Sequence, residues 1–181
     1  RVVAIQHGRP IFHLSASFQH PEPGVEHRLE MPDAPDPERL PSFSERMAPM
    51  LATANDEVRR WLQRERPIDV REVEPTNEFA PEKRPPHQLV WIRADGRLPD
   101  DLLLHQCVMA YASDMTLLDT VTLPHALSWW DPNTQMASLD HAMWFHRPFR
   151  ADAWLLYAQE SPSASGARGF ATGRFFTREG V

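Results

Sequence analysis

The spacing of apolar and polar residues divides this chain into three parts. Residues 1–19 form two short runs on either side of His7-Gly8-Arg9, and the second run alternates apolar and polar positions. This pattern is typical of a β-hairpin with one apolar face. Prolines recur among acidic and polar residues from 20 to 84, as in a linker, and a globular pattern follows Pro85-Pro86. We therefore expect a terminal hairpin (1–20), a proline-rich interdomain linker (21–84) and a C-terminal domain (85–181).

Two stretches of the linker have a periodicity of their own. Residues 45–64 place apolar side chains at helical spacing, and residues 68–73 are suited to a short strand. The linker is therefore expected to carry a short helix and to pack on the rest of the protein.

The C-terminal domain is organised around residues 102–118, which are apolar nearly all round at first. A helix without a polar face belongs inside a fold, and the preceding Pro99-Asp100-Asp101 is typical of a capped helix start. Strands are expected at residues 88–94, 138–146, 154–160 and 168–177. One buried helix followed by a run of strands predicts an α+β fold, in which an antiparallel sheet wraps the helix. Cys107, within this helix, is expected to be a small core residue.

Asp114 is the main chemical candidate in this domain. A carboxylate buried beside Tyr111 and Met115 would have its charged form disfavoured, which is typical of functional acids. The alternative is an ordinary aspartate at a helix end or in a solvated turn. Ser138, on the next predicted strand, could hold a water together with Asp114, with an ordinary strand hydroxyl as the alternative.

Composition and motifs exclude several classes of function. The chain has 181 residues and a net charge of −6 without a basic patch, so we expect no nucleic-acid partner. No apolar run reaches the roughly 18 residues of a membrane span, and a single cysteine is compatible with a reducing cytoplasm. Nucleophile-elbow, P-loop and dinucleotide-binding motifs are absent, and the nine histidines lack metal-ligand spacing. Neither a metal nor a cofactor is expected.

Four segments carry a resemblance to a known family: Y-A-S-D (111–114), S-L-D-H-A-M-W-F-H-R-P-F (138–149), W-L-L-Y (154–157) and S-A-S-G-A-R-G (163–169). In them the chain resembles acyl-CoA thioesterase II, a family of double hotdog proteins that hydrolyse acyl-CoA to fatty acid and CoA. The resemblance implies a catalytic aspartate, hydroxyl and glutamine. Asp114 and Ser138 match the first two, and the glutamine would lie beyond Val181. The chain would then be a segment truncated at both ends, with most of the N-terminal hotdog and the last strand of the C-terminal one missing, and by itself inactive.

The resemblance also implies an acyl-CoA substrate, and we expect a homo-oligomer. Arg147, Arg150 and Arg168 are candidate partners of the CoA phosphates, with solubilising surface charge as the alternative. Asp114 would act as a base for water or attack the thioester itself. Other functions to consider are a non-catalytic acyl-CoA binding or interaction module and a hotdog-type enoyl-CoA hydratase. The hydratase pattern requires a histidine five residues after the aspartate, where this chain has Asp119.

Overall fold

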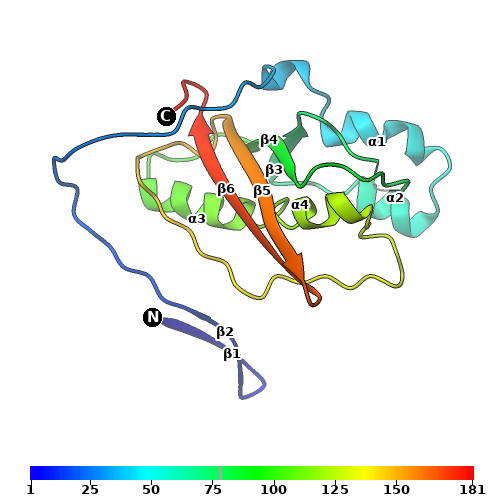
Figure 1. Ribbon diagram of the computed structural model, residues 1–181, viewed down its shortest axis with the longest axis horizontal. Coiled ribbons are helices and arrows are strands. Elements are labelled where there is room, and N and C mark those ends of the chain that lie inside the picture. The colour runs from blue at the N-terminus through cyan, green and yellow to red at the C-terminus, as the bar shows by residue number, and fades with distance from the viewer. Residues whose placement is uncertain (78) are drawn as a thin grey trace.

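The computed structural model describes residues 1–77 and 79–181 and contains two antiparallel sheets within them. A hairpin forms the first, and the second has four strands in the order β3-β4-β5-β6, with α3 and α4 across one face (Figure 1). The strands are β1 (Val2–Gln6), β2 (Arg9–Leu14), β3 (Ile68–Glu72), β4 (His87–Ala94), β5 (Leu155–Ser165) and β6 (Arg168–Thr177). The α-helices are α1 (Phe43–Leu51), α2 (Asp56–Leu62), α3 (Leu102–Ala112) and α4 (Asp119–Thr122), with 3-10 turns η1 (Pro37–Arg39) and η2 (Leu123–His125). The predicted antiparallel α+β fold is confirmed.

Each face of the four-stranded sheet carries a core cluster, and successive side chains of a strand contribute to opposite faces. On β4, Val90 and Ile92 are fully buried and share a core cluster with Met109 of α3. Trp91, between them, belongs instead to a second cluster, with Leu156 of β5. The sheet therefore has a core on the α3 side and another on the opposite side.

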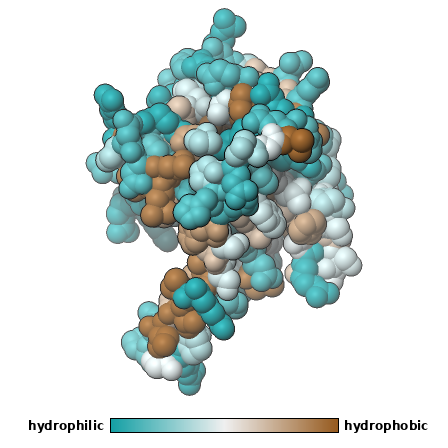
Figure 2. Space-filling model, turned by 90° about the vertical axis from the view of Figure 1, so that its left-hand side faces the viewer, coloured by the Kyte–Doolittle hydropathy of each residue, from teal (hydrophilic) through white to brown (hydrophobic). Residues whose placement is uncertain are grey.

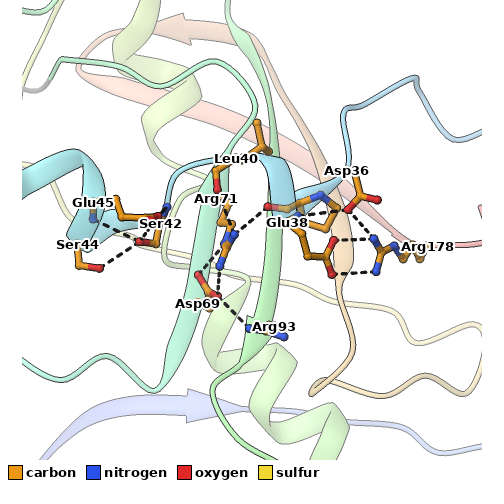
Figure 3. Close-up of polar contacts among 11 residues, drawn as sticks. Asp36, Glu38, Leu40, Ser42, Ser44, Glu45, Asp69, Arg71, Arg93 and Arg178 are labelled. Carbon is orange, nitrogen blue, oxygen red and sulfur yellow. Dashed lines mark hydrogen bonds and ion pairs between the residues drawn. The ribbon is translucent and has the colours of Figure 1, made fainter.

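The second core is closed by part of the proline-rich segment. Met31, Ala34 and Leu40 pack on the cluster around Trp91. The guanidinium of Arg71 on β3 donates to the carbonyl oxygens of Pro37 and Leu40 at 2.9 and 3.1 Å, as Figure 3 shows. The prediction that this segment packs on the rest of the protein is therefore confirmed.

Ion pairs also attach this segment to the end of β6. In the same view, Arg178 pairs with Asp36 and Glu38 at the N-terminus of η1 (Figure 3). Acidic groups are favoured at a helix N-terminus, so these carboxylates suit both the turn and the arginine. The pairs are partly exposed and contribute little individually.

The helical stretch predicted within residues 45–64 is two helices. The side chain of Ser42 accepts a hydrogen bond from the Glu45 amide and forms a capping box that starts α1. The side chain of Asn55 caps α2 in the same way by accepting from the Val58 amide at 2.9 Å. A second N-cap inside the periodic stretch explains why one continuous helix is wrong. The short strand predicted next is present as β3 and pairs with β4.

The start of α3 is as predicted, but its surroundings are not. The Asp101 side chain accepts from the amides of Leu103 and Leu104, which is an N-cap. His105, Met109 and Ala112 face the sheet and are buried. Leu103 and Tyr111 are each 57% exposed, and Cys107 is exposed as well. The predictions of an enclosed helix and of a core cysteine are wrong, because the described elements cover α3 only on its sheet side.

The hairpin lies apart from the four-stranded sheet (Figure 1). His7 and Gly8 have positive φ angles of 51° and 75°, as a tight two-residue turn requires, so the predicted turn is confirmed. Phe12 and Leu14, on the predicted apolar face, are 55% and 44% exposed. Figure 2 shows apolar side chains gathered on the hairpin, at the lower end of that view. The predicted apolar face is therefore present and open to solvent.

The strand predicted at residues 138–146 is absent. This stretch has an extended backbone but pairs with neither described sheet, and the order of the larger sheet ends at β6.

Among the helices in residues 1–77 and 79–181, none has the length and hydrophobicity needed to cross a membrane.

Candidate active site

Asp114 lies in the turn that follows α3. The helix ends at Ala112, Ser113 is its C-cap, and the side chain of Asp114 is 51% exposed. The expected burial of this carboxylate is therefore wrong, and the alternative of a solvated turn describes its position. Water can therefore reach the carboxylate.

Ser138 and His141 surround this carboxylate. The Ser138 hydroxyl donates to Oδ1 of Asp114 at 2.9 Å, across 24 positions of sequence. Nδ1 of His141 lies 3.8 Å from the same oxygen, and Nε2 of the ring is 2.8 Å from Oγ of Ser113. The structure thus brings the two predicted residues together and adds a histidine. The sequence analysis did not select His141, because side chains of the strand expected at 138–146 alternate between faces, which would separate residue 141 from residue 138; no strand is formed there.

Two buried side chains of β5, Tyr157 and Gln159, form hydrogen bonds with the turn that carries Asp114. Tyr157 donates its hydroxyl hydrogen to the Ser113 carbonyl oxygen at 3.1 Å, and burial raises the pKa of this phenol, so it stays protonated. The Gln159 amide donates to Oγ1 of Thr116 at 2.6 Å and accepts from the Gln88 amide at 2.6 Å. The Gln88 amide also donates to the Thr116 carbonyl oxygen at 2.9 Å. These bonds attach the turn carrying Asp114 to β4 and β5.

Gln159→Leu is expected to destabilise the protein by roughly 1–3 kcal/mol, because the partly buried amide of Gln88 and the buried hydroxyl of Thr116 each lose a partner. Gln159 is only 3% exposed, so water cannot readily replace it. Urea unfolding of the full-length protein measures the effect, with Gln19→Leu, in the exposed segment after β2, as the control. Equal midpoints for Gln159→Leu and the unsubstituted protein would show that the network does not stabilise the fold.

The Asp114 carboxylate opens into a large groove. Its volume is about 1730 Å³, and it is lined by residues from the end of α3, from the extended segment around 134–149, from β5 and β6, and from residues 22–29. Apolar side chains such as Leu117, Met143 and Phe175 line the groove beside the polar cluster. An apolar groove of this size beside a carboxylate suits a ligand with a long apolar part.

The three candidate arginines do not lie together. Arg147 and Arg168 line the groove that contains Asp114, and Arg147 donates to the carbonyl oxygen of His27 at 3.3 Å. Arg150 instead pairs with Asp152 and Asp100 and donates to the Leu98 carbonyl oxygen, outside the groove. Its guanidinium holds the pKa of Asp152 well below the ordinary range. Arg150 thus tethers the start of α3 to the segment before β5.

Over residues 1–77 and 79–181, no group of 3 or more histidine, cysteine, aspartate or glutamate side chains is arranged to hold an ion. The cluster around Asp114 contributes a carboxylate, a hydroxyl and an imidazole to the groove.

Comparison with known proteins identifies relatives of this chain. Human acyl-coenzyme A thioesterase 8 is 41% identical over 188 residues, which are 99% of this chain and 58% of that protein. Acyl-CoA thioesterase 2 of Haemophilus influenzae is 37% identical over 179 residues, which are 99% of this chain and 63% of that protein. The chain thus spans about 58–63% of the length of these relatives.

Solved structures and a family model agree with these relatives. The crystal structure of an acyl-CoA thioesterase II, TesB2, from Mycobacterium marinum is 41% identical, with a TM-score of 0.74, and the match covers 98% of this chain and 61% of that one. A TesB protein of Mycobacterium avium is 29% identical, with a TM-score of 0.62, over 87% of this chain and 50% of that one. The model of the acyl-CoA thioesterase family matches residues 58–181. With its helix-on-sheet hotdog architecture and this match, the chain belongs to the acyl-CoA thioesterase family.

Proposed function

We propose that the protein hydrolyses acyl-CoA thioesters to a fatty acid and CoA, with Asp114 and Ser138 positioning the attacking water. The observation that carries this proposal is the 2.9 Å hydrogen bond from Ser138 to Asp114 at the wall of the groove. Membership in the acyl-CoA thioesterase family supports the substrate class.

The geometry suits a general-base reaction. Ser138 donates its hydrogen to Oδ1 of Asp114, so its oxygen can accept a hydrogen bond from a water, while Oδ2 takes the proton of that water as it attacks the thioester carbonyl. The proton then passes to the departing CoA thiolate. Direct attack by Asp114, with an acyl anhydride that water later cleaves, is the covalent form of the same reaction.

The phosphates of CoA are anionic and are expected to bind cationic side chains. Arg147 and Arg168, which line the groove, are the proposed contacts of its phosphates. The paired Arg150 is less suited to this role, because Asp152 and Asp100 already engage its guanidinium. The proposal also includes a homo-oligomeric, cytoplasmic enzyme without a nucleic-acid partner, as expected from the sequence.

The hydratase alternative finds no support in the geometry. The residue five positions after Asp114 is Asp119, and its carboxylate accepts from the indole of Trp129 at 2.9 Å. A binding module without activity is distinguished by assay. The full-length protein is expected to release CoA from decanoyl-CoA, detected with a thiol reagent. Binding of decanoyl-CoA without any release of CoA would support the module and contradict the proposal.

Ser138→Ala is expected to lower kcat about tenfold or more, because only the hydroxyl can hold the water and Asp114 together. Ser138→Thr keeps this hydroxyl and should retain most of the activity. Both variants are compared by CoA release with Ser15→Ala, a serine in the exposed segment after β2. If alanine and threonine at 138 give equal rates, the hydroxyl plays no part in the reaction.

A further inference from the structure

His141 makes two contacts with consecutive residues at the end of α3. Its Nε2 is 2.8 Å from Oγ of Ser113, and its Nδ1 is 3.8 Å from Oδ1 of Asp114. The side chain of His141 is 30% exposed, less than the 51% of Asp114. One ring thus spans the residue that caps the helix and the carboxylate assigned to the reaction.

The hydrogen-bond partners indicate how the ring is held. Ser113 donates its hydroxyl hydrogen to the Ala110 carbonyl oxygen at 3.0 Å, a common arrangement in the last turn of a helix. Its oxygen is then free to accept a hydrogen from Nε2 of His141. The other ring nitrogen, Nδ1, faces the Asp114 carboxylate, and donation to both partners requires a hydrogen on each ring nitrogen, as in the imidazolium form.

The contact at 3.8 Å is an electrostatic one and is longer than a hydrogen bond. Contacts of this kind in an unliganded site often shorten when the substrate binds. Ser138 approaches the same carboxylate oxygen, Oδ1, so the two side chains together restrict how the Asp114 carboxylate can turn.

The segment that carries Ser138 and His141 gains from the same contacts. It joins no sheet among the strands that the structure describes, so ladder hydrogen bonds do not hold it. The Ser138–Asp114 and His141–Ser113 bonds are two ties, three positions apart, between this segment and the end of α3. Two ties fix the orientation of a segment where a single tie would let it pivot.

We propose that His141 is a positioning residue that holds the Asp114 carboxylate against Ser138 and in line with the attacking water. The role of His141 rests on the proposed thioesterase function, because it acts through Asp114. Misplacing a reacting group by about an ångström can cost up to a hundredfold in rate, so a positioning contact has a measurable effect on kcat.

Three substitutions at His141 separate its two contacts. His141→Phe keeps a flat ring and removes both nitrogens. His141→Asn keeps a donor near the place of Nδ1, and His141→Gln keeps one near the place of Nε2. In the full-length protein, His141→Phe is expected to lower kcat about tenfold or more and to leave KM for decanoyl-CoA within about twofold. His141→Asn should recover most of kcat, and His141→Gln should not.

A double substitution tests whether His141 acts through Asp114. Adding His141→Phe to Asp114→Asn is expected to lower kcat no further, because the group that His141 positions has already lost its basic oxygen. His87→Phe is the control, since this histidine lies exposed at the start of β4, outside the groove. Thermal melting of every variant shows whether a lower rate reflects unfolding, and the Asn variant tests the role if the Phe variant melts early.

The outcomes separate this inference from the function on which it rests. If the protein hydrolyses decanoyl-CoA, Asp114→Asn is impaired and His141→Phe keeps the full kcat, then His141 has no positioning role and the thioesterase proposal stands. The same conclusion follows if His141→Phe lowers kcat equally with and without Asp114→Asn, or if Gln rescues better than Asn. If no hydrolysis of acyl-CoA is detected, both proposals fall.

Discussion

Asp114→Asn is expected to reduce acyl-CoA hydrolysis by about a hundredfold or more, because the amide has nearly the same shape and cannot take a proton from water. Ser138 can still donate to the amide oxygen, so the local structure should persist. The side chain is 51% exposed, so removing its charge should change the stability little. The measurement is kcat and KM for decanoyl-CoA in the full-length protein.

Asp56→Asn, at the exposed start of α2, is the matched control and should keep the full rate. Substrate binding by Asp114→Asn should be close to normal, so the loss is expected in kcat. An Asp114→Asn protein that retains more than half of the unsubstituted rate would remove this carboxylate from the mechanism.

Gly173→Ala is expected to destabilise the protein by roughly 1–3 kcal/mol, because the added methyl group overpacks a filled site. A Cβ at this position would lie 2.9 Å from Cζ of Tyr157, with the ring edge closer still. The ring cannot move aside freely, since it stacks on Phe175 with a centroid separation of 3.8 Å. Its hydroxyl also holds the Ser113 carbonyl oxygen, so the turn carrying Asp114 should shift and kcat should fall as well.

Urea unfolding and the rate of CoA release measure the two effects in the full-length protein. Gly24→Ala is the control for the unfolding measurement, because a Cβ there meets nothing within 4 Å. A midpoint for Gly173→Ala equal to that of the control would mean that Tyr157 can rearrange without cost, and the proposed support of the turn by Tyr157 would then be wrong.

The sequence alone predicted the structural features that depend on interactions between near neighbours along the chain. The N-cap of α3 depends on one aspartate beside the first helical amides, and the turn at His7-Gly8 depends on positive φ angles. The strands β4, β5 and β6 followed from short apolar runs between turn residues. The motif around Ser138 was specific enough to indicate the family, and the family model confirms it.

The tertiary structure alone decided which apolar surfaces are covered and which strands find a partner. An apolar pattern all round residues 102–112 shows that a helix can be enclosed, but the described elements enclose only the side with His105 and Met109. Residues 138–146 alternate like a strand without pairing with one, because strand pairing depends on a neighbour that local pattern does not reveal. The contacts of His141 and Gln159 with the turn carrying Asp114 arise from residues 28 to 43 positions apart in sequence. Only the folded chain brings such groups together, since spacing along a sequence determines neighbours within one helix or strand and not across the core.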